Sequence, residues 1–572
     1  MKCRWSLAPP QPGLAAQIAA AHRISPLAAQ CLLNRGIREP GDIARFLAPR
    51  LKQLADPFLL PNMAAAVERL LAALNNSEPV VIFGDYDVDG VTSAALLVEV
   101  LRALGWRVEC YLPHRMEEGY GLSRDGVENC LNKYPATLLL AVDCGSTAVE
   151  TIAWLRERRV DAIVLDHHQV SSPPPAAVAL VNPQLAGENE ISFRDLCSAG
   201  LAFKLAHALV KRGRDLGLPG MEQFDLRPLL DLVALGTVAD VVPLTGENRI
   251  FVTAGLERLS VTQRPGLVAL KKIAQCPDKL NTMDVGYQLA PRLNAAGRLE
   301  NAQESLQLVL ARSAAEAEPL ARNLDYHNQE RQKIERGITT GVIGAVKARF
   351  NAQTDFVIVE GQLLWHIGVV GIVASRVLQQ FYRPTFILGG EGGNWRGSGR
   401  SIAGFDLAAA LRECDDLLVR HGGHAMAAGV TILPENMDAF RQRLNDIARR
   451  WLKPDDLLPL LRLDAEVALR DLTLDMLAEL DQLKPTGQGN PPLQFSARQL
   501  ACARPVQRMG AEKQHAKLWV TDGATTHEAV WWGAGAAAMP EGKFDLVFTP
   551  QVNEFAGRRT VQLKVLDWRP AA

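Results

Sequence analysis

The chain has 572 residues, of which 48% are hydrophobic and 22% are charged, and its formal net charge is −1. This length exceeds what one hydrophobic core supports, so we expect three to four domains of a soluble globular protein. The balanced charge excludes a basic surface over the whole molecule, so any basic surface for nucleic acid has to be local.

The cysteine pattern and the hydropathy pattern exclude several further classes of protein. The nine cysteines are scattered and include no CxxC pair. This argues against a disulfide framework and a zinc ribbon, and it indicates a reducing cytoplasm. The N-terminal stretch MKCRWSLAPPQPG has no apolar core, and no run of about 20 apolar residues follows it. We therefore expect neither export nor a membrane span.

The first 50 residues are predicted to form a short helical segment. Helices are expected at SPLAAQCLLNRG and EPGDIARFLAP. Ser25 is suited to cap the first of them because Pro26 follows it in the first helical turn.

Residues 51–312 are predicted to form a domain built around a parallel sheet. Continuous apolar strands alternate with amphipathic helices, a pattern typical of a parallel sheet that is covered on both faces. The expected strands are residues 79–83, 107–112, 137–142, 161–165 and 178–181. Residues 198–275 are expected to be mostly helical.

Three further segments complete the predicted organisation. Residues 313–350 are expected to form a long connecting helix. Residues 351–455 are expected to form a second α/β domain, with a glycine-rich loop at GGEGGNWRGSGRS. Residues 456–572 consist of short alternating strands and turn signals, which predict an all-β module compatible with a small Greek-key barrel.

Acidic and imidazole side chains follow several of the predicted strands of the first domain. The carboxyl ends of parallel strands meet at one edge of a sheet, which is where such folds bind ligands. The residues that we expect at or near this edge are Asp85, Asp87, Asp89, Asp143, Asp166, His167, His168 and Asp240. An alternative for Asp87 or Asp89 is to cap the following helix, and Asp166 could instead end a strand at a turn.

So many carboxylates in one crevice are unstable without a counter-ion. Two divalent cations about 3.5–4 Å apart would balance the charge and give the cluster a catalytic purpose. Mainly oxygen ligands with some nitrogen favour Mn²⁺ or Mg²⁺ over a thiolate zinc site. Cys144 is adjacent but alone, and we interpret it as a packing residue.

The motifs in this region resemble those of the DHH phosphoesterase superfamily. GDYDVDG, VDCGS, LDHH and TVADVVPL match its four motifs in order, and Asp85 stands where many members have histidine. GGHAMAAG resembles the signature of the DHHA1-type domain that accompanies DHH domains. The resemblance extends through HIGVVGIVASR, GSGRS and the C-terminal β module to nearly the whole chain.

The resemblance implies a role for each residue of the cluster. One metal ion would be held by Asp85, Asp87 and Asp143, and the other by Asp89, Asp143, His167 and Asp240. Asp87, Asp166 and His168 are expected in the catalytic group, with His168 facing the phosphate and Asp166 orienting a histidine. The implied chemistry is two-metal hydrolysis of a phosphodiester.

Basic residues outside the cluster are candidates for binding the substrate. These candidates are Arg115, Arg292, Arg298, Arg376, Ser398, Arg400 and His424. For the glycine-rich stretches around Ser398, Arg400 and His424, the alternative is a set of tight turns. For Arg115, Arg292 and Arg298 it is a salt bridge to Glu117, Glu118 or Glu300, and Arg376 is as well explained by a structural role.

The C-terminal module interleaves basic and aromatic residues. The basic residues are Lys513, His515, Lys517, Arg558, Arg559 and Lys564, and the aromatic ones are Trp519, Trp531, Trp532 and Phe555. Exposed aromatic rings between basic rims would bind a single strand by stacking and phosphate contacts. The alternative is that the tryptophans are core residues. The resemblance favours an oligonucleotide-binding (OB) barrel.

The function implied by the resemblance is a single-stranded-DNA-specific exonuclease that degrades from 5′ to 3′ and releases 5′-mononucleotides, in DNA repair and recombination. One alternative is a DHH phosphodiesterase that acts on short oligonucleotides or cyclic dinucleotides. An alternative of another class is a non-catalytic scaffold that binds single-stranded DNA. The family also leads us to expect a cytoplasmic monomer that works with a single-strand-binding protein and a helicase.

Overall fold

The computed structural model describes residues 3–114, 118–119, 121–187, 193–299, 301–390, 393–535 and 537–571. The chain divides into two compact units. One unit consists of Glu39–Gln329 and Leu483–Pro491, and the other of Met1–Arg38, Glu330–Gln482 and Pro492–Ala572. This division is coarser than the five segments expected from the sequence, whose boundaries stay a prediction.

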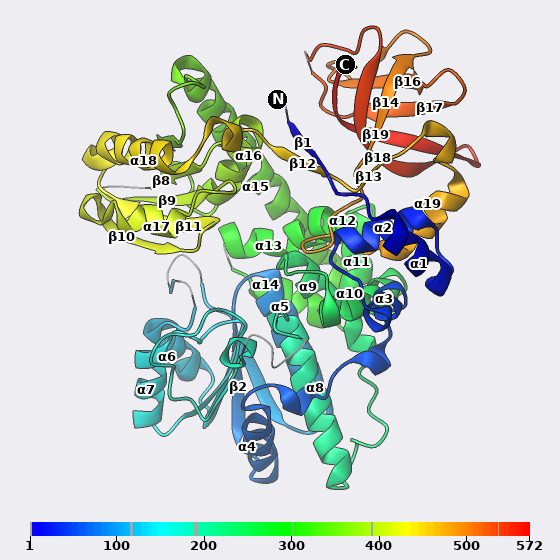
Figure 1. The fold of residues 1–572 in the computed structure, drawn as a ribbon. Helices are drawn as coiled ribbons and strands as arrows, with labels where there is room; N and C mark the ends of the chain where they lie inside the picture. Colours follow the sequence, from blue (N-terminus) through cyan, green and yellow to red (C-terminus); the bar gives the residue numbers. More distant parts are fainter. Residues whose placement is uncertain are drawn as a thin grey trace. The chain divides into compact units, whose positions relative to one another are not determined.

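The unit around Glu39–Gln329 contains the expected parallel sheet (Figure 1). Its strands lie in the order β3-β2-β4-β5-β6, and each neighbouring pair is parallel. The bounds are β2 Pro79–Gly84, β3 Arg107–Tyr111, β4 Leu138–Val142, β5 Asp161–Leu165 and β6 Ala179–Val181. The predicted strands are therefore confirmed to within one residue at every end.

Helices cover both faces of this sheet because both faces are apolar. Alternate strand residues such as Ile82 and Leu140 belong to one hydrophobic core, and their neighbours such as Val81 and Leu139 belong to a second one. The first core includes residues of α4 Met63–Asn75, α5 Val88–Ala103 and α8 Ser198–Asp215; the second includes residues of α6 Arg124–Lys133 and α7 Val149–Glu157. Side chains alternate between the two faces of the sheet along each strand, so successive residues belong to different cores.

The remainder of this unit is helical, as expected for residues 198–275. The elements are α9 Leu230–Ala239, α10 Gly246–Ser260, α11 Pro265–Ile273, α12 Thr282–Asp284, a π-helical turn η5 Val285–Leu289, α13 Ala290–Leu299 and α14 Gln303–Leu310. Helix α5 packs against α8, α9 and α14 and so lies at the centre of this part of the fold. The long helix α15 Ala314–Arg349 then spans the predicted connector.

The second α/β region has a mixed sheet in the order β10-β11-β9-β8-β7. Its elements are β7 Ile358–Gly361, α16 Val370–Phe381, β8 Thr385–Gly389, β9 Trp395–Arg400, α17 Leu407–Arg412, β10 Leu418–Gly423, β11 Ala427–Ile432 and α18 Met437–Trp451. The prediction that the whole stretch GGEGGNWRGSGRS is a loop was wrong, because residues 395–400 form strand β9. The glycines have a packing role there: a Cβ on Gly399 would lie 2.4 Å from the Phe386 ring.

The C-terminal strands form a closed barrel. Strand order β14-β18-β19-β17-β16 is completed by a pairing of β16 back to β14. The bounds are β14 Phe495–Cys502, β16 His515–Thr521, β17 Thr526–Trp531, β18 Phe544–Phe555 and β19 Arg558–Pro570, with β13 Ala465–Glu466 and β15 Gln507–Met509 beside them. The expected all-β module is confirmed, although it is preceded by helix α19 Leu474–Leu480.

The N-terminal segment contains the expected helices and two further elements. Ser25 caps α2 Pro26–Asn34 as predicted, since its Oγ accepts a hydrogen bond from the amide of Ala28 at 3.1 Å. Helix α3 is Pro40–Leu47, whereas α1 Pro12–His22 and strand β1 Arg4–Leu7 were not expected. Strand β1 pairs in parallel with β12 Leu460–Leu463, a distant segment that local sequence patterns do not reveal.

Among the described helices, none is by itself long and apolar enough to cross a membrane, and one bent pair, Leu51–Leu59 with Met63–Asn75, meets the criteria of length and composition.

Candidate metal centre

The loop after β2 holds its aspartates in a tight turn. A Cβ on Gly90 would lie 2.5 Å from the carbonyl oxygen of Asp85, so only glycine permits this closure against the first turn of α5. Asp87 is the N-cap of α5, because its Oδ1 accepts hydrogen bonds from the amides of Asp89 at 2.9 Å and Gly90 at 3.1 Å. The capping interpretation is thus right for Asp87, and the same side chain also lies within the acidic cluster.

Asp143 ends strand β4 in a conformation that few residues adopt. Its φ is +64°, in the left-handed region, and its amide donates to the carbonyl of Leu165 at 3.0 Å. Non-glycine residues in this region are often found at functional sites. The bend places its carboxylate beside those of Asp85 and Asp87, close enough for the three to share one cation.

The N-terminus of α8 binds two carboxylates of the cluster. Asp89 accepts hydrogen bonds from the amides of Ser198 at 2.7 Å and Ala199 at 2.8 Å, and the Oγ of Ser198 donates to Asp143 at 2.8 Å. Free amides and the positive end of the helix dipole favour negative charge here. A Cβ on Gly236 would come within 2.9 Å of Asp89 Oδ1, so this glycine lets α9 approach the cluster.

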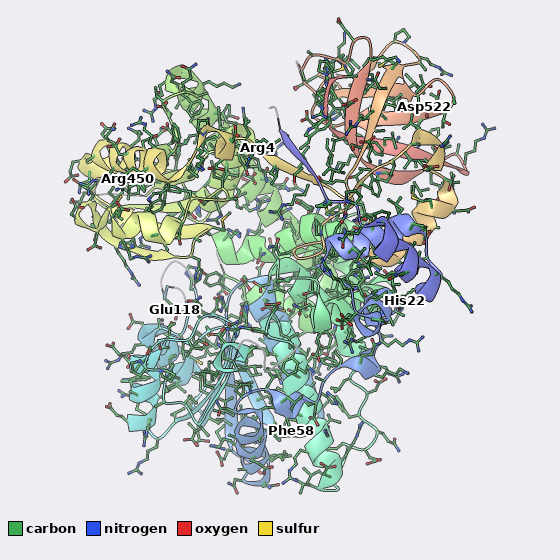
Figure 2. The ribbon with its side chains drawn as sticks, in the orientation of Figure 1. Arg4, His22, Phe58, Glu118, Arg450 and Asp522 are labelled. Atoms are coloured by element: carbon green, nitrogen blue, oxygen red, sulfur yellow. The ribbon has the colours of Figure 1, made fainter. Side chains whose placement is uncertain are left out.

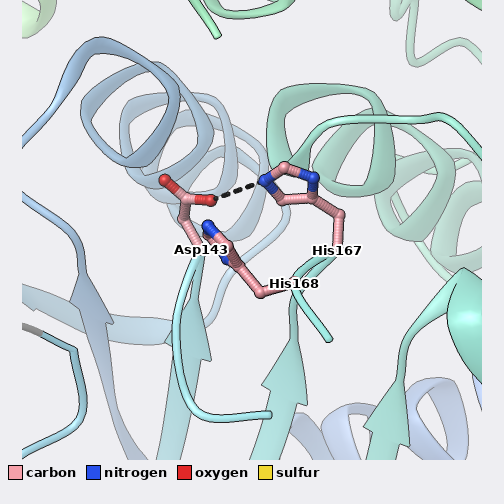
Figure 3. A group of neighbouring side chains, drawn as sticks. All are labelled: Asp143, His167 and His168. Carbon is pink, nitrogen blue, oxygen red and sulfur yellow. Dashed lines mark ion pairs between the residues drawn. The ribbon is translucent and has the colours of Figure 1, made fainter. Parts of the chain in front are cut away.

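His167 lies among three carboxylates without bonding to any of them. Its Nε2 is 3.4 Å from Asp143 Oδ1, 3.5 Å from Asp240 Oδ2 and 3.9 Å from Asp89 Oδ2. Figure 3 shows its ring directed at Asp143. Both this nitrogen and Asp240 Oδ2 are buried and lack a hydrogen-bond partner in the described part of the chain. Burial, followed by the nearby charge of His168, lowers the pKa of His167 to about 4, so its ring is neutral and can offer a lone pair.

His168 has a different environment. Its Nδ1 is 2.7 Å from Asp166 Oδ1, and that carboxylate also accepts hydrogen bonds from the amides of Ser146, His167 and His168. Burial alone would lower the pKa of His168, but the bond to Asp166 and the surrounding carboxylates outweigh it and raise the pKa to about 9. Burial likewise opposes ionisation of Asp166, yet its hydrogen bonds hold its pKa below the usual range. The pair is therefore an imidazolium held by a carboxylate.

The remaining carboxylates destabilise one another. Burial and then neighbouring aspartates raise the pKa of Asp89 to about 6 and that of Asp240 to about 9, and they raise the pKa of Asp143 well above its usual value. Within the described residues, three groups bring their ligand atoms close enough for a metal ion: Asp85–Asp87–Asp143, Asp89–His167–Asp240 and Asp143–His167–His168. Unbonded ligand atoms and uncompensated negative charge fit divalent cations held by oxygen and nitrogen.

The structure brings together the predicted metal ligands. The arginines predicted to bind the substrate differ from one another in their partners and in their exposure. Arg292 forms an ion pair with Asp325 at 2.8 Å, a partner that the salt-bridge alternative did not name; of the partners that it did name, Glu117 and Glu300 lie outside the described residues. Arg298 is half-buried on the same helix, α13, whose Gly297 packs against the backbone of Tyr86. Arg376 forms an ion pair with Glu335 at 2.9 Å, which is compatible with the structural role that was its alternative.

Arg115 lies outside the described residues. Of its possible partners, Glu118 is labelled in Figure 2. It accepts hydrogen bonds from the hydroxyl of Tyr111 and the amide of His114, both at 2.6 Å.

Strand β9 presents a guanidinium without a counter-charge. Arg400 donates to Ser398 Oγ and to the carbonyl of Gly399, both at 2.8 Å, and it has no acidic partner in the described part of the chain. Burial lowers its pKa. Gly371 keeps the space beside both side chains open, because a Cβ there would lie 3.0 Å from each. His424 is exposed in the turn between β10 and β11.

The aromatic residues of the barrel fall into two classes. Trp519 is half-buried between Arg504 and Lys517, which lie 5.4 and 6.0 Å from its ring centroid. Trp532 and Phe555 are exposed by 54% and 78%. The interpretation of the tryptophans as core residues is therefore wrong for Trp532.

Two contributors to the site were not expected from the sequence. Ser198 binds Asp143 and Asp89 through its hydroxyl and its amide, and Asn294 Oδ1 accepts from the amide of Val88 at 3.1 Å. The small residues Ser198-Ala199-Gly200, which open a long apolar helix, are the signal that could have indicated an anion-binding helix terminus. Asn294 offers no comparable signal.

Comparisons with known proteins agree with this geometry. Residues 79–237 match the DHH family N-terminal domain, residues 353–450 the DHHA1 domain and residues 463–567 the RecJ OB domain. The chain is 36% identical to the single-stranded-DNA-specific exonuclease RecJ of Bacillus subtilis, over 99% of this chain and 71% of that protein. It is also 36% identical to the same-named exonuclease of Dickeya dadantii, over 93% and 94%.

Solved structures give the same result. The crystal structure of RecJ from Thermus thermophilus in complex with Mn²⁺ matches with a TM-score of 0.85 and 30% identity, over 100% of this chain and 80% of that one. Its complex with Mg²⁺ matches with a TM-score of 0.79 and 29% identity, over 100% and 79%.

Proposed function

This chain belongs to the RecJ family of single-stranded-DNA-specific exonucleases, and we propose that it removes 5′-mononucleotides from the 5′ end of single strands by two-metal hydrolysis. The exonuclease activity on single-stranded DNA comes with the family. The polarity, the product and the role of each residue are the proposal.

The observation that carries the metal chemistry is the unbonded Nε2 of His167 among three carboxylates. Asp85, Asp87 and Asp143 would hold one Mn²⁺ or Mg²⁺ ion, and Asp89, Asp143, His167 and Asp240 the other. When bound, the two ions supply Lewis-acid activation of water and stabilise the charge on the phosphorus and the leaving oxygen. The helix α8 amides keep Asp89 ionised and oriented for this task.

His168 would contact the scissile phosphate directly. Its imidazolium, with a pKa raised to about 9, can donate from Nε2 to a non-bridging oxygen while Asp166 holds Nδ1. That donor would add positive charge where negative charge develops in the transition state. Asp166 would act by positioning this ring rather than by touching the substrate.

The substrate strand would be gripped by charges outside the metal centre. Arg400 and Ser398 are suited to a phosphate of the DNA backbone, because this guanidinium lacks an acidic partner in the described region. Exposed aromatics of the barrel, such as Trp532, would stack on bases. Arg115, Arg292, Arg298, Arg376 and His424 are kept as further candidates, although the ion pairs of Arg292 and Arg376 occupy part of their hydrogen-bonding capacity.

We further propose a cytoplasmic monomer that serves DNA repair and recombination together with a single-strand-binding protein and a helicase. Support comes from the family, because other DNA-processing steps must expose the single strand on which such an exonuclease acts.

The direct test uses single strands labelled at the 5′ or the 3′ end, with duplex DNA as the control and Mn²⁺ or Mg²⁺ present. Release of labelled mononucleotide from 5′-labelled strands at the earliest times is expected, together with slow shortening of 3′-labelled strands. Early mononucleotide release from the 3′ label, or cleavage confined to dinucleotides and cyclic dinucleotides, would contradict the proposal.

A further inference from the structure

A cavity of about 620 Å³ lies in the Glu39–Gln329 unit, at the end of α5 remote from the metal centre. Its lining includes Glu99 and Arg102 of α5, ten or more residues beyond Asp89. At about 1.5 Å per residue, this end of the helix is about 15 Å from the carboxylate cluster. The cavity has the size of sites that hold nucleotide-sized ligands, and no role in the exonuclease reaction accounts for it.

The charged lining is basic. Four guanidinium groups face two carboxylates, and the charged residues are Glu99, Arg102, Asp231, Arg258, Arg264 and Arg312. Both carboxylates are engaged by Arg264, whose NH2 lies 3.1 Å from Glu99 and whose Nε lies 3.4 Å from Asp231. Asp231 is also fixed by the hydroxyl of Thr262 at 2.7 Å. Arg264 and these two carboxylates together carry a net charge of −1, and their contacts hold them in place.

The other three guanidinium groups of the lining differ in how many hydrogen bonds and ion pairs they form. Arg102 donates to the carbonyl of Val108 and to Glu109, at 3.1 and 3.2 Å. Arg258 and Arg312 form no ion pair within the described chain, and the Nε of Arg258 is shielded from solvent without a hydrogen-bond partner there. The nearby carboxylate of Asp225 is already held by two nitrogens of Arg227 at 2.8 Å.

We propose that this cavity binds a phosphate group through Arg258 and Arg312. Two unpaired guanidinium groups match one dianion, and a phosphate monoester carries close to two negative charges at pH 7, whereas a carboxylate carries one. The two charges can come from the phosphate monoester of a small phosphorylated molecule, or from two successive phosphodiester groups of a DNA backbone, each of which carries one negative charge. Helices α5 and α9 run from this cavity, at Glu99 and Asp231, to the metal centre, at Asp89 and Asp240, so both ends of each helix meet a ligand site.

The test is calorimetric titration of the full chain with pyrophosphate and with ADP, in the presence of a chelator so that no metal ion can hold the probe. Arg258→Gln and Arg312→Gln should each weaken binding by about tenfold, which corresponds to one lost charge-assisted hydrogen bond. Arg156→Gln, which removes an exposed guanidinium of α7 elsewhere in the same unit, is the matched control and should leave the affinity unchanged.

A third variant changes the affinity in the opposite direction. Glu99→Gln removes one negative charge from the lining and should tighten pyrophosphate binding, an effect that misfolding cannot imitate; circular dichroism checks the fold of each variant. The same variants titrated with a single-stranded oligonucleotide distinguish the source of the phosphate. If Arg258→Gln and Arg312→Gln weaken binding of the oligonucleotide only, the site binds a DNA backbone. If they weaken binding of neither probe, the inference is wrong.

Discussion

The parallel sheet of residues 79–181 and the mixed sheet of residues 358–432 both carry buried charge, but of opposite sign. The first gathers carboxylates such as Asp89 and Asp143, whose pKa values are raised by burial and then by their mutual repulsion. The second carries Arg400, whose guanidinium has only neutral partners in the described region. Each region therefore lacks a different counter-ion, a cation in one case and an anion in the other. An enzyme that hydrolyses a phosphodiester with metal ions needs both.

The strongest test of the acidic region is the removal of a carboxylate that is shared between the proposed ions. Asp143→Ala should lower the rate of hydrolysis by at least about a thousandfold, because the metal ions contribute several kcal/mol to the transition state. The rate of mononucleotide release, measured with Mn²⁺ or Mg²⁺, checks this. Oligonucleotide affinity should change far less, so a loss of binding with unchanged turnover would remove Asp143 from the metal centre.

The corresponding test of the basic region is Arg400→Gln. We expect kcat/KM on single-stranded DNA to fall by about 10- to 100-fold, since one charge-assisted phosphate contact is lost. Arg396→Gln, on the same strand but exposed, is the matched control. The salt dependence of DNA affinity should become shallower for Arg400→Gln, as one fewer counter-ion is released. An unaltered salt slope together with unaltered kcat/KM would break the comparison between the two sheets.

The acidic region also predicts how stability depends on pH. In the folded, metal-free protein Asp240 and His168 keep protons up to pH about 9, whereas in the unfolded chain their usual pKa values are 3.8 and 6.5. The folded state thus binds more protons between pH 7 and 9, so the free energy of unfolding should fall as pH rises, by about 1.4 kcal/mol per pH unit for each group.

Urea denaturation at pH 7, 8 and 9 measures this slope. With Mg²⁺ bound, the ligands are already deprotonated, and the decline should flatten or reverse. A metal-free protein that becomes more stable over this range would show that the carboxylates do not repel one another as described.

The smallest expected effect concerns the helix terminus that supports the cluster. Ser198→Ala removes the hydroxyl donor to Asp143 but keeps the backbone amides that bind Asp89. Metal affinity should fall by about tenfold, as is usual when a group that orients a ligand is lost. Titration of Mn²⁺ into the variant gives the value, and excess Mn²⁺ should restore hydrolysis. Persistent inactivity in saturating metal would assign Ser198 a different role.

The two sheets also differ in how much of them could be predicted. The acidic cluster could be predicted because residues that follow parallel strands lie at the same edge of the sheet. The amino-acid sequence is therefore enough to group Asp85, Asp143 and His167. Strand β9 was mistaken for a loop, because its glycines suggest turns when they in fact make room for Leu388 and Phe386. Glycine is locally compatible with a turn and with a strand. Only the side chains packed against it show which of the two is formed.

Other features could not be predicted, because they join residues that are far apart in the sequence. The pairing of β1 with β12 and the contact of Asn294 with Val88 join segments separated by hundreds of residues, and neither leaves a periodic pattern. A salt bridge was weighed for Arg292 and only an unspecified structural role for Arg376. Their partners, Asp325 and Glu335, both lie on helix α15, and the sequence pattern could not place that helix beside them.

The pairing of β1 with β12 has a consequence for the order of folding during synthesis. Arg4 lies opposite Leu460, and the indole of Trp5 donates to Asp567 at 2.8 Å. All strands of the parallel sheet are translated before residue 200, whereas β1 has no partner until residues 460–463 have been translated. Residues 4–7 are therefore made before the parallel sheet but can reach their native place only after β12 and the barrel strands have been made.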